Sequence, residues 1–460
     1  MVRASVVAEK AGLRSVSIVA SGFVPQARAI AQALGVRDLA IAEYPGVIMT
    51  DSPQEFQKKV ENLVEQVVEG LATPVKAVAR PVEPQPRETI FEGALGDVQE
   101  HFHKNLWSDG LPVIPPTLDS VEEFLRCTDR SPDQALGVLA PEKRQATVWN
   151  VAVNGVMAGC RPEYMPLLVA IVEAIADPHF RIEDGGSTPG WEPLVILNGP
   201  IVKELDFNSG PGVMRVGRQA NSSVGRFLRL YMRNVAGLRI PPGATDKGSI
   251  GYSFNVALAE NEDAVRELGW QPFSADRGFR AGENVVTVQS VVSISPPIYP
   301  GGDKAQDLAQ TIAEVFGQAT CGYWSFTGMA FNHWYPLLVM SPSIAKGIAR
   351  SGWTKDDLRK YLCENVTMPA GLLEKYAWQA GLTDFSLRKL VEEGVLPREY
   401  AQSADPNRPV RVFLRPDWIG IVVAGDPDRN QARGYVNNHA QGVPVSRKIE
   451  LPARWQQLLQ

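Results

Sequence analysis

The chain has 460 residues, of which 44% are hydrophobic and 21% are charged, and its formal net charge is −5. This length exceeds a single ordinary hydrophobic core and predicts a large soluble protein of about two or three domains. Because the charge balance is mildly acidic, the sequence excludes the broad basic surface of a nucleic-acid-binding protein, and no nucleic acid is expected as a partner.

Residues 1–74 alternate helix and strand patterns. A helix is expected over Met1–Ala11, and a buried strand follows at Ser15–Ser21. An amphipathic helix over Gln26–Leu34 ends before a glycine, which is a common helix stop, and a second short strand follows at Asp38–Ala42. The segment therefore predicts βα units on a parallel sheet.

The helix that closes this segment has a clear start signal. Asp51 or Ser52 can cap its first turn, and Pro53 suits the first helical position. Its apolar residues recur at helical spacing, which predicts one buried face. They are Phe56, Val60, Leu63, Val67 and Leu71.

A sheet of only two strands buries too little apolar surface to be stable alone. We therefore expect residues 1–74 to be half of an α/β domain that begins in mid-domain, with strands of another polypeptide completing its sheet. The next stretch, PVKAVARPVEPQPR, has four prolines and no apolar period. This composition predicts a proline-rich linker at residues 75–89.

The rest of the chain is expected to form a larger mixed α+β domain, so that the fold class is α/β. Residues 90–340 are assigned to a main α/β ligand-binding domain, and residues 341–460 to a C-terminal helical segment with a closing strand. Helices are predicted at Glu92–Leu106, Val121–Thr128, Tyr164–Ala176, Ser222–Val235, Ala305–Phe316, Ile344–Ser351 and Lys355–Glu364. Strands are predicted at Leu194–Leu197, Phe254–Ala259, Asn284–Ser293 and Trp418–Ala424.

Neither a membrane-spanning segment nor a secretory signal is evident. No run of roughly 18 apolar residues occurs, and the opening Met-Val-Arg-Ala-Ser lacks a basic flank followed by an apolar stretch. We therefore expect a cytoplasmic protein with no membrane partner. The four cysteines form no CxxC pair, which predicts free thiols rather than disulfides or a thiolate zinc site.

Cys160 is a candidate catalytic residue. It lies just before a helix expected to begin near Pro162, and Arg161 is its neighbour. The positive end of a helix and an adjacent cation stabilise a thiolate, which a nucleophile requires. The alternative is a small buried apolar side chain, with Arg161 paired to Glu163.

Two further candidate catalytic residues lie in unusual segments. Asp109 stands in Ser-Asp-Gly-Leu-Pro, where a carboxylate on a rigid loop can act as a general base or metal ligand. The alternative is a turn residue, because Asp-Gly favours turns. His333 lies in an aromatic-rich stretch, Cys321–Tyr335, which predicts either the wall of an apolar pocket or core packing.

Amide side chains, glycines and arginines concentrate in residues 198–226. Glycines let a ligand approach the backbone closely, and amide donors with fixed positive charges suit an anion such as a carboxylate or phosphate. The alternative is a set of ordinary turns with surface arginines. The expected substrate-binding residues are Asn154, Arg161, Asn198, Asn208, Ser209, Arg218, Asn221 and Arg226.

Polar amides within apolar segments must be hydrogen-bonded when they are buried. We therefore expect one domain over Glu92–Pro300 with several such residues facing a common cleft. No GxGxxG or GxxxxGK(S/T) signature is present, so a Rossmann or P-loop nucleotide site is rejected, and no motif indicates a cofactor or a metal. The residues expected to face the cleft are Asn150, Asn154, Cys160, Asn198 and Asn208.

Several long and unusual strings stand out along the chain. They are Ala8–Gly12, Phe23–Pro45, Trp107–Thr117, Val153–Pro166, Leu197–Pro200, Asn208–Gly210, Ala259–Glu262 and Trp418–Asp426. These strings resemble the UGSC family, which contains selenocysteine or cysteine and is named after a U-G-S-C motif. The resemblance implies thiol or selenol redox chemistry and a distant similarity, in the selenoprotein half, to component B of glycine reductase. It also implies that the motif would stand just before Met1 and that a separate small chain supplies it.

Three functions follow as expectations. The first is a subunit of a thiol- or selenol-dependent oxidoreductase that acts on a small anionic or polar organic substrate, with the redox motif on a separate chain. The second is a self-sufficient carboxylate- or metal-dependent hydrolase or lyase that uses Asp109, Glu163, Glu260 and His333. The third is a non-catalytic binding or assembly subunit. Self-association of the chain is a further expectation.

Overall fold

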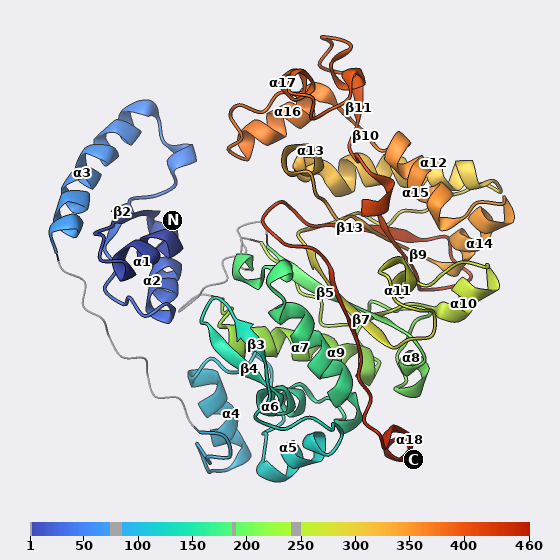
Figure 1. Ribbon diagram of the computed structural model, residues 1–460, viewed down its shortest axis with the longest axis horizontal. Coiled ribbons are helices and arrows are strands. Elements are labelled where there is room, and N and C mark those ends of the chain that lie inside the picture. Colours follow the sequence, from blue (N-terminus) through green and yellow to red (C-terminus); the bar gives the residue numbers. More distant parts are fainter. Residues whose placement is uncertain (1, 74–84, 186–189, 241–249) are drawn as a thin grey trace.

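The computed structural model describes residues 2–73, 85–185, 190–240 and 250–460. It shows an α/β fold with a small N-terminal unit and a larger body (Figure 1). Most of the linker predicted at residues 75–89 lies outside the described residues. No described helix is long and apolar enough to cross a membrane.

The N-terminal unit contains the elements that the sequence predicts, in the predicted order. They are α1 (Val2–Lys10), β1 (Ser17–Ala20), α2 (Val24–Ala33), β2 (Ile41–Tyr44) and α3 (Pro53–Ala72). Strands β1 and β2 form a parallel two-stranded sheet, as expected. Strand β2 begins later than predicted, because the residues before it form a turn.

Helix α3 begins at the predicted cap. The Ser52 hydroxyl accepts a hydrogen bond from Glu55 N, and the Glu55 carboxylate accepts one from Ser52 N in return. This reciprocal capping box satisfies N–H groups that the first turn of a helix leaves free. Of the predicted apolar face, Leu63 is buried against β2, whereas Phe56 and Leu71 are exposed.

The body contains two four-stranded sheets. The first has the order β14-β7-β5-β6 and the second the order β12-β9-β13-β8. Each sheet has one parallel pair, β5 with β6 and β9 with β12, and the other pairs are antiparallel. The strands are β5 (Glu192–Asn198), β6 (Leu258–Ala259), β7 (Val285–Val291), β8 (Ser293–Ile294), β9 (Leu337–Met340), β12 (Gly420–Val423), β13 (Ala432–Val436) and β14 (Val445–Lys448).

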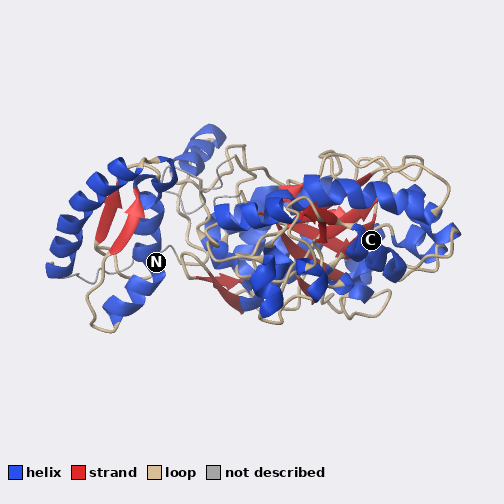
Figure 2. Cartoon of the chain, turned by 90° about the horizontal axis from the view of Figure 1, so that it is seen from above, coloured by secondary structure: helices blue, strands red, loops and turns tan. Residues whose placement is uncertain are grey.

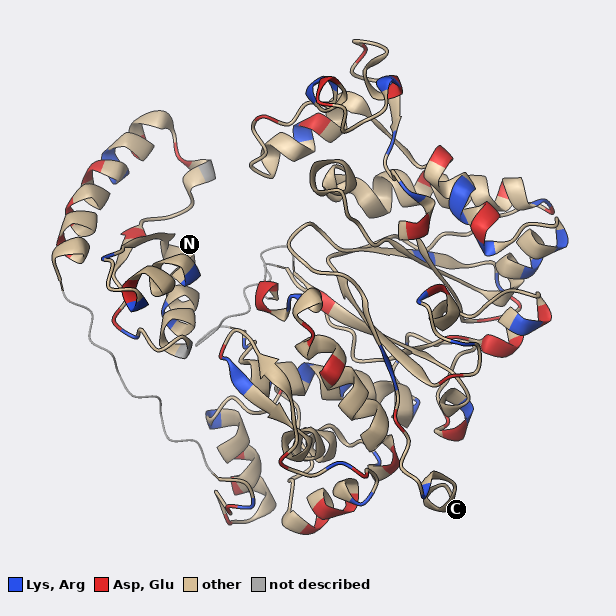
Figure 3. Ribbon diagram, in the orientation of Figure 1, with Lys and Arg blue, Asp and Glu red and all other residues tan. Residues whose placement is uncertain are grey.

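The body has four layers, helices on sheet on sheet on helices (Figures 1 and 2). In β5, Val195 and Leu197 pack in the core under α7 and α9, while Leu194 and Ile196 pack against the second sheet. The alternation continues in the second sheet, where Leu337 and Val339 face the first sheet and Leu338 and Met340 face the outer helices. Strands that are buried on both faces explain the nearly continuous apolar runs in the sequence. Charged residues lie mainly on the outer helices and loops (Figure 3).

Helices α6 (Val148–Ala158), α7 (Met165–Ala176) and α9 (Gln219–Tyr231) cover the first sheet, and α12 (Ala305–Val315), α14 (Pro342–Arg350) and α15 (Lys355–Asn365) cover the second. The remaining elements are shorter or peripheral. They are α4 (Leu95–Lys104), α5 (Leu118–Leu125), β3 (Ala135–Leu139), β4 (Arg144–Thr147), α8 (Ile201–Glu204), α10 (Glu262–Glu267), α11 (Phe273–Asp276), α13 (Thr327–Phe331), β10 (Thr367–Pro369), α16 (Ala370–Gln379), α17 (Leu387–Glu392), β11 (Pro409–Arg411) and α18 (Trp455–Leu458).

The sheets combine strands that are distant in the sequence. Strand β9 ends at Met340 and pairs with β12 and β13, and β14 pairs with β7. Strands on both sides of residue 340 therefore share each sheet. Of the strand predicted at Phe254–Ala259, only the last two residues form β6, and the helix predicted at Ser222–Val235 begins earlier, at Gln219, and continues as a π-helix, Met232–Ala236.

Candidate functional site

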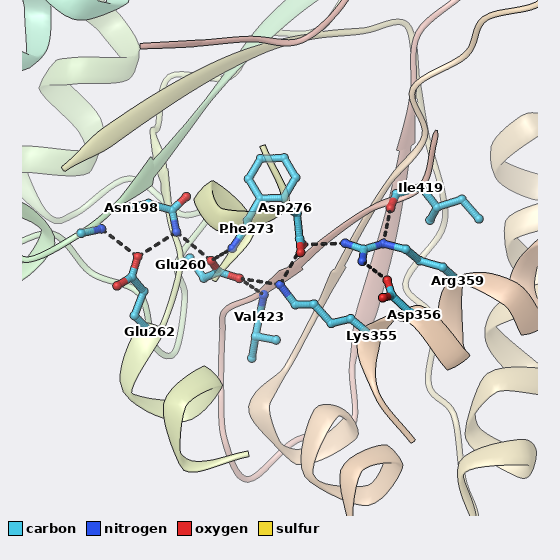
Figure 4. Close-up of polar contacts among 11 residues, drawn as sticks. Asn198, Glu260, Glu262, Phe273, Asp276, Lys355, Asp356, Arg359, Ile419 and Val423 are labelled. Carbon is cyan, nitrogen blue, oxygen red and sulfur yellow. Dashed lines mark hydrogen bonds and ion pairs between the residues drawn. The ribbon is translucent and has the colours of Figure 1, made fainter. Parts of the chain in front are cut away.

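The carboxyl ends of three strands converge on one buried carboxylate, Glu260 (Figure 4). Glu260 follows β6, and its Oε2 accepts hydrogen bonds from Asn198 Nδ2 at the end of β5 (2.7 Å) and from Phe273 N (2.6 Å). Its Oε1 accepts a hydrogen bond from Val423 N at the end of β12 (3.1 Å). Ligand sites of α/β sheets typically lie beyond such strand ends.

A chain of buried ion pairs extends from Glu260 to the opposite side of the junction (Figure 4). Lys355 Nζ lies 3.9 Å from Glu260 Oε1 and 3.2 Å from Asp276 Oδ2. Arg359 Nη2 lies 2.5 Å from the same oxygen of Asp276, and Arg359 Nε donates to the carbonyl of Ile419 (3.0 Å). The Lys355 side chain is only 5% exposed, so these charges are largely removed from water.

Helix α15 positions both cations of this chain. The residue before it, Thr354, accepts a hydrogen bond from Asp357 N in a capping box, which fixes where the helix begins. Lys355 and Arg359 are four residues apart and therefore project from one face of the helix. That face meets α11, which supplies Asp276, and Ile419, the residue before β12.

Burial raises the pKa of the Glu260 carboxyl above its ordinary value of 4.5, because a charge is costly in a site without water. Lys355 and the three N–H donors oppose this shift. The pKa of Glu260 is thus set by two opposing effects: burial favours the neutral acid, and Lys355 with the three donors favours the carboxylate. Removal of its nearest cation would leave the burial cost uncompensated.

A cavity of about 670 Å³ opens beside Glu260. We call it the acidic cavity, because its carboxylates outnumber its cations, Lys203 and Arg266, both of which pair with Asp263. Glu262 lines it and accepts hydrogen bonds from Gly199 N (2.8 Å) and Asn198 Nδ2 (3.0 Å). Its carboxylates are Glu204, Glu260, Glu262 and Asp263, and its apolar wall includes Phe207, Val265 and Trp270.

Two residues named from the sequence lie at this junction, Asn198 as a substrate-binding residue and Glu260 as a titratable group of a hydrolase or lyase. The Asn198 amide nitrogen donates to both Glu260 and Glu262. Its buried Oδ1 has no hydrogen-bond partner among the described residues. An unsatisfied buried acceptor costs free energy and is a candidate for contact with a ligand or water. Ser209, another predicted residue, lines the acidic cavity, and its carbonyl accepts a hydrogen bond from Gly425 N.

Arg218 and Arg226, two of the three arginines expected to bind substrate, are already paired. Arg226 makes a bidentate ion pair with Asp109, with Nε–Oδ2 and Nη2–Oδ1 distances of 2.9 Å, and it also donates to Pro112 O. Arg218 pairs with Asp206 at the surface. The predicted anion site therefore lacks its free positive charges, and neither arginine lines the acidic cavity.

Asp109 fastens a loop to α9 rather than presenting a free carboxylate. The Arg226 side chain lowers the pKa of Asp109 against the opposing effect of burial, and the N–H of Leu111 also donates to it. A carboxylate in a bidentate pair is a poor general base, because protonation would break both bonds. The structure therefore agrees better with the alternative interpretation, in which Asp109 is a turn residue of the Asp-Gly pair.

Cys160 lies in the predicted place before α7, but its thiol is buried and 8% exposed. Burial raises the pKa of Cys160 to about 12, and Ser223 and Arg226 offset this only in part. Arg161 turns away to Glu163 (3.5 Å) and to the face of Tyr164. The thiolate expected from the helix terminus and from Arg161 is therefore not favoured in this structure.

We expect native Cys160 to react slowly with iodoacetamide at pH 7, because the reactive thiolate is scarce when the pKa is about 12. Mass mapping of alkylated peptides over time measures this rate, and unfolding in denaturant should raise it many-fold. Cys127, which is buried with a pKa of about 11, is the matched thiol within the chain. Rapid alkylation of Cys160, but not of Cys127, in the native protein would support the hypothesis that the Cys160 thiol is activated.

The remaining amides hold the fold together through protein partners. Asn221 bonds Asn208 N, Asn208 O and Ala257 O, and so ties α9 to the strand region before β6. Asn154 bonds Asn150 O and Asn234 Nδ2. None of the five residues predicted to face a common cleft lines the acidic cavity or the second cavity described below.

His333 lies in an aromatic cluster, as one of the two readings predicts. Its Nδ1 is 2.8 Å from Phe331 O, and Phe331 stacks on His439 with ring centroids 4.4 Å apart. Burial lowers the pKa of His439 below 6.5, with His333 adding to the effect. Neither Glu163 nor His333 lies in the ion-pair chain around Glu260. No group of three His, Cys, Asp or Glu side chains in the described ranges could hold a metal ion.

Sequence reasoning missed Lys355, Asp276 and Arg359. The spacing of Lys355 and Arg359 within a correctly predicted helix was the available signal. This spacing did not indicate burial, because polar residues dominate the helix. The partner is also distant in the sequence, since Lys355 and Asp276 are 79 residues apart.

Comparison with known proteins relates part of this α/β protein to a family. Residues 1–73 match the model of the UGSC family. This segment corresponds to the unit of α1 to α3, and the match confirms the resemblance there. The strings beyond residue 73, and with them the site around Glu260, lie outside the match. No curated protein and no solved structure matches the chain.

Proposed function

We propose that the chain is the substrate-binding subunit of a thiol- or selenol-dependent oxidoreductase, and that a separate small chain carries the redox motif. The match of residues 1–73 to the UGSC family supports the redox class. In this chemistry the two thiols of the motif, or its selenol and thiol, become a disulfide or selenenyl sulfide. The two electrons and two protons released reduce the substrate.

The observation that carries this proposal is the asymmetry of the N-terminal sheet. Hydrogen-bonding groups alternate in direction along a strand. Ser17 N donates to Ala40 O on the β2 side, so Ile18 and Ala20 direct their N–H and C=O groups to the outer edge of β1. No described residue bonds to the N–H or C=O of Ile18, whereas the C=O of Ala20 begins the 3-10 helix Ser21–Phe23.

The other edge of the sheet is closed. Glu43 of β2 directs its backbone outward, and Gln66 of α3 occupies both of its groups. Gln66 Oε1 accepts from Glu43 N (2.9 Å), and Gln66 Nε2 donates to Glu43 O (3.4 Å). A side-chain cap of this kind prevents strand addition. An incoming strand of a partner chain is therefore directed to β1.

Exposed apolar side chains on the N-terminal unit support the need for a partner. Ile18 on β1 is 42% exposed and Val68 on α3 is 62% exposed. Apolar surface of this extent on a small unit typically marks an interface. The other exposed large apolar residues of the unit are Val7, Leu13, Phe23, Val47, Ile48, Phe56, Val64 and Leu71.

The acidic cavity is the proposed substrate site. Its carboxylates are acceptors, so the fitting substrate is a small polar organic molecule that carries N–H or O–H donors. Phe207 and Trp270 would cover its apolar part. A volume of about 670 Å³ is that of a typical small-molecule site.

Proline substitutions test the partner. Ile18→Pro removes an outward N–H from β1, and proline is tolerated at an edge position whose N–H is not bonded within the sheet. Ile41→Pro is the matched control, because Ile41 directs its N–H to the closed edge of β2. Co-expression of the tagged full chain with the motif-bearing chain, followed by size-exclusion with light scattering, measures assembly.

We expect the wild-type chain and Ile41→Pro to assemble with the motif-bearing chain. Ile18→Pro should no longer assemble with it. Turnover with a dithiol reductant should require the assembled pair. Assembly that persists in Ile18→Pro would place the partner elsewhere. Full activity of the chain alone would favour the self-sufficient enzyme instead.

A further inference from the structure

A second cavity, of about 420 Å³, lies at the other end of the ion-pair chain. It is lined by Asp276 of α11, Asp356 and Arg359 of α15, and the segment of residues 416–420. Arg277 and Lys360 also line it. We call it the basic cavity, because Arg277 and Lys360 make no ion pair with a described carboxylate.

Each aspartate of the basic cavity already has an ion-pair partner. Asp276 pairs with Lys355 and Arg359, and Asp356 pairs with Arg359 (2.7 Å). Asp417 makes a bidentate pair with Arg415, with a shortest distance of 2.6 Å. Each aspartate thus has a cation within 2.7 Å, and of the three cations in the lining Arg359 alone takes part in these pairs.

Arg277 and Lys360 are the other two cations of the lining. Neither makes an ion pair with a carboxylate in the part of the chain that the structure describes. Arg277 donates one hydrogen bond, from Nη2 to Pro444 O (2.7 Å), although a guanidinium has five N–H donors. Burial lowers the pKa of Arg277, and the nearby Tyr335 and Asp276 offset this only in part.

The rest of the lining suits a small oxyanion. Tyr335 lines the cavity near Arg277, and its hydroxyl makes no hydrogen bond to a described residue. Gln289, which is 2% exposed, lines it as well and holds Tyr335 O through Nε2 (2.7 Å). Burial raises the pKa of Tyr335, so the phenol remains a proton donor at neutral pH.

We propose that the basic cavity binds a small oxyanion, a carboxylate or a phosphate group, through Arg277 and Lys360, with Tyr335 as a further donor. Arg277 offers a planar fork that matches two oxygens, and Lys360 adds a point charge. This site is distinct from the acidic cavity and does not depend on the proposed redox function. The ion-pair chain from Glu260 to Arg359 separates the two.

Isothermal titration of the full chain at low ionic strength tests the site, with inorganic phosphate and succinate as the two probes. We expect a dissociation constant of about 1 mM for the better probe, which also identifies the oxyanion class. Arg277→Gln should weaken binding about tenfold and Lys360→Gln several-fold. Added salt should weaken it as well.

Arg218→Gln is the matched control, since it removes the same charge from an arginine that pairs with Asp206 away from the cavity. It should bind the probes as the wild type does. Arg277→Lys keeps the charge and should retain part of the affinity. If Arg277→Gln fails to fold, Lys360→Gln still tests the site, because Lys360 is exposed. Absence of binding to both probes, or equal loss in Arg218→Gln, overturns the proposal.

Discussion

Lys355→Met is expected to lower the free energy of unfolding by about 3 kcal/mol at neutral pH. The substitution keeps the length of the side chain but removes the cation between Glu260 and Asp276. Asp276 keeps Arg359, whereas Glu260 loses the one positive charge near it among the described residues. The cost is that of a buried carboxylate with hydrogen bonds but no counter-ion. Urea unfolding followed by circular dichroism measures it.

The pH dependence of this loss identifies its cause. The folded-state pKa of Glu260 is raised above the ordinary 4.5 and should rise further in Lys355→Met. A raised carboxyl pKa gives stability that is present below the ordinary value and is lost as the pH rises through the folded value. The destabilisation should therefore be small below pH 4.5 and grow above it.

Lys360→Met is the control for Lys355→Met. Lys360 lies on the same helix and makes no ion pair with a described carboxylate, so its loss should change the free energy of unfolding by no more than about 0.5 kcal/mol. Equal effects of the two substitutions, or a pH-independent loss in Lys355→Met, would show that Glu260 is not the group affected.

Gly225→Ala should destabilise the protein by about 3 kcal/mol, because the backbone it meets cannot move cheaply. A Cβ at Gly225 on α9 would lie 2.2 Å from Val256 N and 2.5 Å from the carbonyl carbon of Asn255. That backbone leads into β6 and to Glu260. The substitution should therefore weaken ligand binding in the acidic cavity as well as stability.

Gly96→Ala is the matched control with the opposite sign. Gly96 lies in α4, and a Cβ there meets no atom within 4 Å. Alanine restricts the unfolded chain and favours the helix, so a gain of about 0.5 kcal/mol is expected. Thermal unfolding of both variants separates a clash at Gly225 from a general effect of replacing a helical glycine.

The sequence predicted elements whose signals are local. Helix α3 was found because Ser52, Pro53 and an apolar period all point to it, and the parallel arrangement of β1 and β2 follows from the βα order. Helix α6 was missed. Its residues are buried nearly all round, so Val148–Ala158 shows no polar face that would reveal the helical period.

The candidate site could be predicted only in part. Asn198 was recognised from its turn, and it does lie at the junction. Its partners could not be found by spacing, because Asn198 and Glu260 are 62 residues apart and Arg226 and Asp109 are 117 apart. Arg226 was assigned to a ligand because a sequence shows a charge but not the distant carboxylate that neutralises it.

The strand order of the second sheet has a consequence for synthesis of the protein. Its central strand, β9, lies between β12 and β13, and both of these neighbours come from residues after 419. On the ribosome, β9 therefore emerges long before either strand that will cover its edges. Pairing between such distant segments folds slowly and leaves an apolar strand open to aggregation meanwhile. Chaperones that hold nascent chains should accordingly raise the yield of folded protein more than lower temperature alone.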